Sequence, residues 1–231
     1  MGADFAMILP SVTPLVAPPL PRGCAPAMCD FASVHFWEDR YATTPTSRDE
    51  WLVPYEGALA ALLSAELGEF REAPILELGC GSSRLSEEMA ADGWSCLTAS
   101  DSSPTAVESA RSRAAAAAAA GARGGSAASF CVADARELSL AFGEGSFAGV
   151  VDKGTVDAIC TGDGWDYEAR RVSRSLRRVL KPGGKWVGVC LTPPSALLAA
   201  MESDQWATLS GERWATSGGS VLYSYVGQTH Y

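Results

Sequence analysis

Strand-like and helix-like segments alternate between residues 74 and 191, and this alternation constrains the fold more than any other feature. Short apolar strand patterns cover residues 73–78, 94–99, 129–133, 147–151 and 185–191, and helical patterns cover residues 82–92, 103–120 and 167–180. Strands joined by crossover helices pair in parallel with right-handed connections. A helix over residues 49–67 precedes this region, and two strands near residues 206–214 and 221–226 follow it. The sequence therefore predicts a doubly wound α/β fold with a mostly parallel seven-stranded sheet.

Residues 1–22 form an apolar segment that five prolines interrupt, namely Pro10, Pro14, Pro18, Pro19 and Pro21. A signal-peptide core is an uninterrupted apolar stretch, so these prolines argue against one. We predict a disordered, proline-rich extension over residues 1–30 and one domain over residues 31–231. An organellar transit peptide is the alternative interpretation of the extension.

The charge and the cysteine pattern argue against several classes of protein. The net charge is −9, whereas nucleic-acid binding requires clustered Lys and Arg, so we expect cationic partners and no nucleic acid. No CxxC pair occurs among the seven cysteines, which favours reduced thiols in a cytoplasmic protein over a zinc site or a disulfide framework. No apolar run reaches the roughly 18 residues that a membrane span requires, so we expect no membrane partner.

A glycine-rich turn follows the first predicted strand. Glu77 precedes Gly79-Cys80-Gly81, and glycines at such a turn let the backbone approach a ligand closely. In doubly wound folds this edge of the sheet binds cofactors. The fingerprint of dinucleotide-binding proteins fails, because Arg84 stands where its third glycine belongs.

Acidic residues follow the next two predicted strands. Asp101 comes 20 positions after Gly81, where a carboxylate can accept both ribose hydroxyls of a nucleoside. The alternative role is an N-cap, for which Ser102 and Ser103 compete. Asp134, followed by Ala135, lies at the end of the third strand. Its position beside the glycine-rich turn and Asp101 favours a role in ligand binding.

The turn with an acidic residue two positions before G-x-G resembles motif I of class I methyltransferases, which use S-adenosylmethionine. Four further segments make the resemblance more specific: residues 36–41 (FWEDRY), Trp51, residues 75–86 (ILELGCGSSRLS) and residues 152–159 (DKGTVDAI). Together they resemble the methyltransferase-like lysine methyltransferases of eukaryotic elongation factor 1A. The resemblance implies the Rossmann-like class I methyltransferase fold and S-adenosylmethionine as cofactor.

The resemblance also implies which residues contact the cofactor: Trp37, Tyr41, Trp51, Gly79, Asp101, Ser102, Asp134, Ala135 and Lys153. In the resembling enzymes the acidic residue at the position of Asp134 meets the adenine amino group. Lys153, at the end of the fourth strand, is placed to pair with the methionine carboxylate, and its alternative is an ordinary surface ion pair with an aspartate. Trp37 and Tyr41 lie four apart and share one helical face, where they either cover the sulfonium by cation–π contact or pack in the core.

A lysine acceptor must lose a proton before it attacks, because its reference pKa is about 10.4. We expect Asp152 and Asp157 to orient the acceptor ammonium and to pass its proton to water. A histidine base is unlikely to serve, since the chain contains only His35 and His230. The predicted function is methylation of lysine side chains on a protein partner such as elongation factor 1A. The alternatives are a small-molecule methyltransferase and a non-catalytic, cofactor-binding partner subunit.

Overall fold

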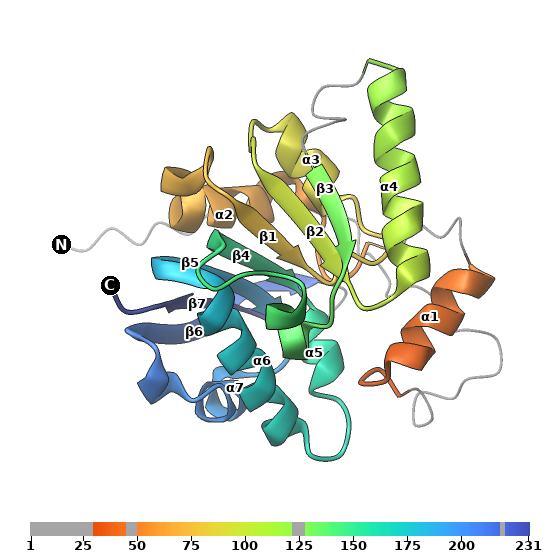
Figure 1. Cartoon of the computed structure of the whole chain (residues 1–231). Coiled ribbons are helices and arrows are strands. Elements are labelled where there is room, and N and C mark those ends of the chain that lie inside the picture. Colours follow the sequence, from red (N-terminus) through yellow and green to blue (C-terminus); the bar gives the residue numbers. More distant parts are fainter. Residues whose placement is uncertain (1–29, 45–49, 122–127, 218–219) are drawn as a thin grey trace.

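The computed structural model describes residues 30–44, 50–121, 128–217 and 220–231. Within these residues one sheet has the strand order β3-β2-β1-β4-β5-β7-β6 (Figure 1). The strands are β1 Ile75–Leu78, β2 Leu97–Asp101, β3 Ala128–Val132, β4 Phe147–Lys153, β5 Leu180–Cys190, β6 Thr208–Ser217 and β7 Ser220–Gln228. Strands β1 to β5 pair in parallel, whereas β7 is antiparallel to both β5 and β6. The predicted doubly wound, mostly parallel seven-stranded sheet is therefore confirmed.

The longer helices are α1 Val34–Thr43, α2 Ala60–Leu67, α3 Leu85–Ala91, α4 Pro104–Ala119, α5 Thr155–Ile159, α6 Trp165–Val179 and α7 Pro194–Ala200. Short irregular turns are η2 Tyr55–Leu59, η3 Gly68–Phe70, η4 Ala135–Leu140 and η5 Ser203–Gln205. The helix expected over residues 49–67 is regular only from Ala60 onward. Leu52 and Gly57 both have positive φ, at 64° and 79°, and a regular helix cannot continue through either residue.

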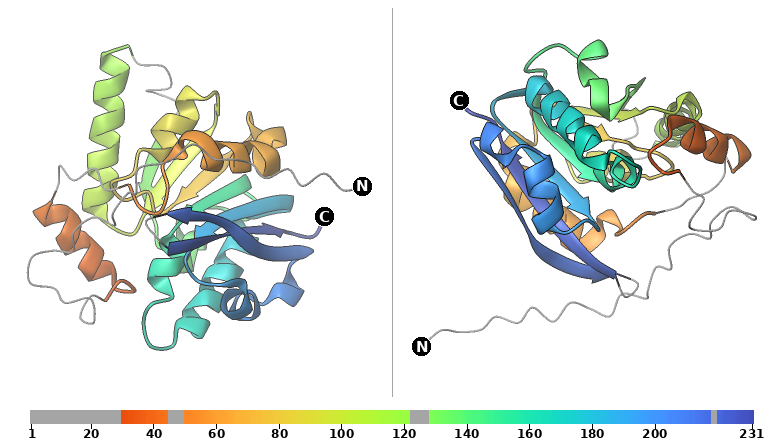
Figure 2. Two further views of the ribbon diagram at one scale, coloured as in Figure 1. Left: turned by 180° about the vertical axis from the view of Figure 1, so that it is seen from behind. Right: turned by 90° about the horizontal axis from the view of Figure 1, so that it is seen from below.

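Alternating residues of β1 face two different helical layers. Leu76 and Leu78 belong to a buried cluster with Val172 and Leu176 of α6. Ile75 belongs to a second buried cluster with Leu63 of α2 and with residues of α3. Figures 1 and 2 show the same division, with α2 and α3 on one face of the sheet and α6 and α7 on the other. The central strands are thus buried on both faces, as their uninterrupted apolar sequences predict.

The carboxyl ends of β1, β2 and β4 meet at one edge of the sheet. Leu78 pairs with Ser100 on one side and with Asp152 on the other, so the turn after β1 lies beside the ends of both neighbours. Helix α1 lies at this edge, next to the beginning of α4 (Figure 1). Ser103 caps α4 by accepting a hydrogen bond from the Ala106 N–H at 3.1 Å. This edge is where the sequence analysis places the site.

The composition led to expectations about the N-terminal extension, membrane spans, metal sites and cysteines. The predicted extension over residues 1–30 lies outside the described residues, apart from residue 30. Among the helices that the structure describes, none is both long and apolar enough to cross a membrane. In the same residues, no three metal-ligating side chains come together. Cys80, Cys96, Cys131, Cys160 and Cys190 are free thiols.

Candidate active site

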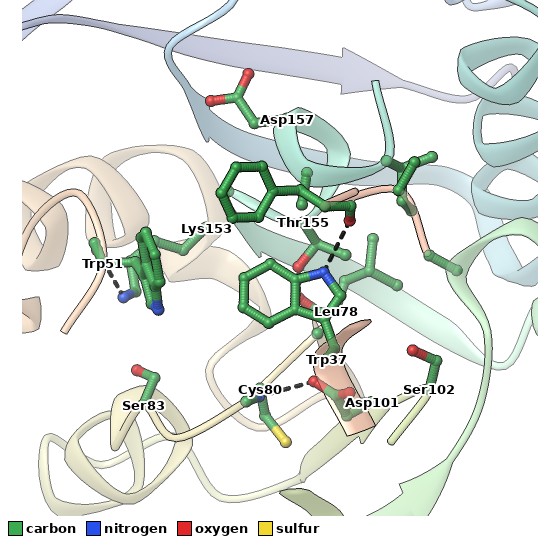
Figure 3. A pocket seen from close by; sticks show the side chains of 18 of the residues that line it. Trp37, Trp51, Leu78, Cys80, Ser83, Asp101, Ser102, Lys153, Thr155 and Asp157 are labelled. Atoms are coloured by element: carbon green, nitrogen blue, oxygen red, sulfur yellow. Dashed lines mark hydrogen bonds between the residues drawn. The ribbon is translucent and has the colours of Figure 1, made fainter. Parts of the chain in front are cut away.

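A cavity of about 350 Å³ opens at the carboxyl edge of the parallel strands. Such a volume and position are typical of small-molecule and cofactor sites in doubly wound folds. All of the predicted site residues except Asp152 line it, namely Trp37, Tyr41, Trp51, Gly79, Asp101, Ser102, Asp134, Ala135, Lys153 and Asp157. Figure 3 shows Asp101 and Ser102 on one side of this cavity, Trp51 and Lys153 on another, and Asp157 on a third.

The glycine-rich turn between β1 and α3 forms part of the cavity wall. Gly79 and Gly81 have φ values of 66° and 48°, in the left-handed region that favours glycine. A Cβ atom at Gly79 would overlap the Thr155 side chain, and one at Gly81 would overlap the Tyr41 hydroxyl group. The two glycines therefore let α5 and α1 pack directly against the turn.

Asp101, the last residue of β2, is held in the cavity wall by two backbone groups. Its carboxylate accepts hydrogen bonds from the Gly81 N–H at 2.8 Å and from the Ser103 N–H at 2.9 Å. Burial raises the pKa of Asp101 to about 6, although the backbone hydrogen bonds oppose that shift. Because Ser103 is the N-cap of α4, the capping role that competed for Asp101 belongs to Ser103.

Asp134 lies beyond the end of β3 and is the N-cap of η4. Its carboxylate also binds the side chain of Arg136. Its carboxylate accepts the Arg136 backbone N–H at 2.9 Å and two guanidinium N–H groups of the same residue. Burial raises the pKa of Asp134, but the hydrogen bonds from Arg136 outweigh it and hold the pKa below the usual value. Arg136 also reaches the Ala32 carbonyl at 3.4 Å, so it connects this edge of the cavity to the segment that precedes α1.

Lys153, the last residue of β4, is an almost fully buried cation. Its ammonium donates to the Glu50 carboxylate and, at 3.0 Å, to the Trp51 carbonyl oxygen. The exposed fractions of the two side chains are 5% for Lys153 and 21% for Glu50. Lys153 is thus paired with a glutamate from the N-terminal segment, and with no aspartate among the residues that the structure describes.

Three aromatic rings cover the cavity from the N-terminal side. The ring of Trp37 stacks on Tyr41 with 5.8 Å between centroids, and meets Trp51 edge-on at 5.9 Å. The Trp37 indole N–H donates to the Phe31 carbonyl at 2.8 Å, which fixes the ring over the cavity (Figure 3). These residues pack on one another and line the cavity at the same time, so the two alternatives of the sequence analysis are not exclusive.

Helix α1 is attached to the start of α4 by a carboxylate, that of Glu38. Glu38 accepts hydrogen bonds from the Ser103 hydroxyl and from the Thr105 hydroxyl at 2.5 Å. The hydrogen bonds from Ser103 and Thr105 lower the pKa of Glu38 below its usual value. The aromatic cover is thereby fixed to the helix that follows Asp101.

Asp152 differs from the other predicted site residues, because the structure does not place it in the cavity wall. It is 1% exposed, and one carboxylate oxygen accepts the Thr155 N–H at 2.8 Å and the Val156 N–H at 3.3 Å, which caps the first turn of α5. The other oxygen is buried without a hydrogen-bond partner. Burial raises the pKa of Asp152 to about 7. A side chain buried below the cavity is not placed to orient an acceptor.

Asp157, in contrast, lies on α5 and lines the cavity. Its carboxylate accepts the Thr192 N–H at 2.9 Å, the Thr192 hydroxyl at 2.6 Å and the Leu191 N–H. These bonds attach the loop between β5 and α7 to α5. Leu191 is 46% exposed and also lines the cavity, so an acidic group and an apolar one lie side by side here.

Sequence reasoning missed Glu38, Glu50 and Arg136, which hold the predicted residues in place. The partners of the two glutamates lie far away in the chain: Glu38 and Ser103 are 65 positions apart, and Glu50 and Lys153 are 103 positions apart. Arg136 binds Asp134 two positions away, and it also reaches the Ala32 carbonyl 104 positions away. Glu50 directly precedes Trp51, and Glu38 directly follows Trp37, so adjacency to a cavity residue was the only available indication.

Comparisons with known proteins agree on the family. Residues 75–184 match a family model described as a methyltransferase domain. The chain is 31% identical over 191 residues to "EEF1A lysine methyltransferase 4" of Mus musculus, an alignment that covers 79% of this chain and 68% of that protein. It is 29% identical over 173 residues to "eEF1A lysine and N-terminal methyltransferase" of Danio rerio, which covers 75% of this chain. The chain spans only 23% of the length of that second relative.

Solved structures share the fold at lower sequence identity. N-methyltransferase NodS from Bradyrhizobium japonicum, in complex with S-adenosylhomocysteine, superposes with a TM-score of 0.61 and 17% identity, over 84% of this chain and 98% of that one. The [4+2]-cyclase SpnF superposes with a TM-score of 0.63 and 14% identity, over 86% of this chain and 97% of that one. A cyclase and a methyltransferase on one fold show that the fold alone does not determine the reaction.

Proposed function

The chain belongs to the family of S-adenosylmethionine-dependent methyltransferases, and we propose that it methylates amino groups of a protein, with lysine side chains of elongation factor 1A as the first acceptors to test. S-adenosylmethionine is its cofactor. The observation that carries the acceptor class is the 31% identity, over 79% of the chain, to a relative named as a lysine methyltransferase of elongation factor 1A.

The chemistry of the cavity residues suits S-adenosylmethionine. The cofactor has a ribose with two hydroxyl donors, an adenine with an amino donor, a sulfonium cation and an amino acid with a carboxylate. Asp101 is an acceptor for the ribose hydroxyls, and the oxygens of Asp134 keep lone pairs for the adenine amino group beside their bonds to Arg136. Trp37, Tyr41 and Trp51 present π faces to a cation. We assign Gly79, Ser102 and Ala135 to the close backbone approach around the nucleoside.

The acceptor side of the proposed site lies near Asp157 and Leu191. When bound, the cofactor supplies a methyl group that its positive sulfur makes reactive toward a nucleophile, so the protein mainly has to position the acceptor. Leu191 offers an apolar contact to the carbon stem of a lysine, and Asp157 accepts from its ammonium. Desolvation of that ammonium in the apolar wall favours its neutral form. Neither His35 nor His230 lines the cavity, so the proton passes to water past Asp157.

Charge supports the choice of partner. The net charge of −9 attracts a basic protein surface and repels nucleic-acid phosphate. A cytoplasmic location and a single domain over residues 31–231 belong to the same proposal.

The test is transfer of a radiolabelled methyl group from S-adenosylmethionine, first to purified elongation factor 1A and then to a whole-cell extract. We expect one labelled band at the elongation factor, and mass spectrometry should place the label on an amine. An enzyme with Asp101→Ala serves as the control for contaminating activity. Strong turnover of a small molecule with no label in protein would reject the protein acceptor and leave the methyltransferase assignment intact.

A further inference from the structure

Glu50, a residue outside the cavity lining, forms an ion pair with Lys153, the buried cation in the cavity wall. The Lys153 ammonium carries three N–H donors. One donates to the Glu50 carboxylate and a second to the Trp51 carbonyl oxygen at 3.0 Å. Both acceptors belong to the segment that precedes η2, and Figure 3 shows Lys153 extending toward Trp51. A tetrahedral ammonium with two donors engaged on that side keeps its third donor for another direction.

The third donor of Lys153 is available to the cavity. Lys153 lines the cavity, whereas Glu50 does not, so the glutamate occupies no space that a ligand would need. Glu50 is itself fixed from a third segment, since the Ser83 hydroxyl donates to it at 3.0 Å. The Ser83 hydroxyl in turn accepts the Leu85 N–H at 3.1 Å, within the first turn of α3. The carboxylate is therefore held between β4 and the glycine-rich turn.

We propose that Glu50 is a positioning residue for recognition of the amino-acid end of the cofactor: it orients the Lys153 ammonium so that its remaining N–H meets the α-carboxylate. This proposal rests on the assignment of Lys153 to that end of the cofactor. It does not depend on the identity of the methyl acceptor, because it concerns ligand binding alone.

Two physical arguments favour a positioning role over competition for Lys153. A competing carboxylate would lie in the cavity, in the place of the ligand carboxylate, whereas Glu50 is not among the residues that line the cavity. A buried cation that loses its partner also becomes costly, and desolvation favours loss of its proton. Without Glu50, Lys153 would therefore be less well directed.

The test is calorimetric titration of the full chain with two ligands: S-adenosylhomocysteine and its decarboxylated analogue, which lacks only the α-carboxylate. In Glu50→Ala we expect the affinity for S-adenosylhomocysteine to fall about tenfold and the affinity for the analogue to stay within twofold. Lys153→Met should show the same pattern, and the double variant should lose no more than either single one. Glu50→Gln, which keeps an acceptor for Lys153, should restore most of the affinity.

Glu56→Ala is the matched control, since Glu56 is an exposed glutamate six positions away. It should leave both affinities unchanged. Equal losses for both ligands in Glu50→Ala would show a merely structural role, and tighter binding of S-adenosylhomocysteine would show competition; either result overturns the proposal. If Glu50→Ala fails to fold, Ser83→Ala replaces it, with an expected two- to threefold loss confined to S-adenosylhomocysteine. An equal loss for both ligands would again overturn the proposal.

Discussion

The ends of β2 and β4 carry the same residue in similar surroundings, yet the two aspartates differ in what they can do. Asp101 and Asp152 flank the end of β1 on either side, both are buried, and burial raises the pKa of each, to about 6 and about 7. Each accepts hydrogen bonds from two backbone N–H groups: Asp101 from the turn after β1 and from the start of α4, and Asp152 from the start of α5. Only Asp101 lines the cavity.

Strand geometry explains the difference. Side chains alternate between the two faces of a strand, so Asp152 shares a face with Val150, and Lys153 shares one with Val151. Val150 packs in the cluster under α6, whereas Val151 packs in the cluster under α2 and α3. Asp152 therefore turns toward α5 and caps it, and Lys153 turns toward the segment with Trp51. A carboxylate at a strand end is a ligand-binding residue only if its face opens to the cavity.

The largest effect that we expect is on stability, in Asp152→Ala. This substitution removes the acceptor of two N–H groups at the start of α5 and leaves them without a partner. Loss of a cap and of buried hydrogen bonds should lower the free energy of unfolding by about 3 kcal/mol. Chemical denaturation measures this change. Affinity for S-adenosylhomocysteine, measured where the variant is folded, should stay within about threefold. A stable variant with lost affinity would place Asp152 in the site after all.

Asp101→Ala should have the opposite effect: a large loss of cofactor affinity and a small loss of stability. A carboxylate that bonds ribose hydroxyls contributes about 1.5–3 kcal/mol, so affinity for S-adenosylhomocysteine should fall roughly 10- to 150-fold. The Gly81 N–H that it leaves faces the cavity, where water can replace the carboxylate, so the unfolding free energy should change by only about 1 kcal/mol. Calorimetry and denaturation of the same preparation separate the two effects. Unchanged affinity with a collapsed melting temperature would make Asp101 a structural residue like Asp152.

Asp157 extends the comparison, because it lies on the helix that Asp152 caps. Asp157→Asn keeps one oxygen as an acceptor for Leu191 or Thr192 but removes the charge that faces an acceptor ammonium. We expect turnover of a protein acceptor to fall about tenfold, equivalent to about 1.4 kcal/mol, with cofactor affinity nearly unchanged. Steady-state kinetics with varied acceptor and cofactor distinguishes the two. A loss of cofactor affinity of the same size would mean that the substitution disturbs the whole cavity.

The sequence was sufficient for the sheet, the glycine-rich turn and the position of Asp101, because each depends on local periodicity or on a short motif. It was insufficient for the contacts of Glu38, Glu50 and Arg136, which exist only once distant segments pack together. Helix α7 was missed because its seven residues are too few to show a helical period. The burial of Asp152 under α5 could have been predicted from the period-two pattern of β4, because Val150 and Asp152 share one face.

The smallest effect concerns the dependence of stability on pH. The folded-state pKa of Asp152, about 7, is higher than its value of about 3.9 in an unfolded chain. The folded protein therefore binds this proton more tightly, so the stabilisation is complete below pH 4 and is lost as the pH rises through 7. Asp101 and Glu77, with pKa values of about 6 and about 7, change stability in the same direction.

Between pH 6.5 and pH 8 we therefore expect the unfolding free energy of the wild type to decrease, with Asp152 contributing roughly 1 kcal/mol of the change. The asparagine in Asp152→Asn cannot ionise and retains an oxygen for the Thr155 N–H. The unfolding free energy of this variant should therefore decrease by roughly 1 kcal/mol less than that of the wild type. Urea denaturation of both proteins across this range measures the difference. Asp101→Asn is the matched comparison, and it should reduce the slope mainly between pH 5 and 6.5, because its folded-state pKa is lower. Identical slopes in the wild type and Asp152→Asn would show that Asp152 is already ionised in the folded protein at pH 6.5, and that burial does not govern its titration.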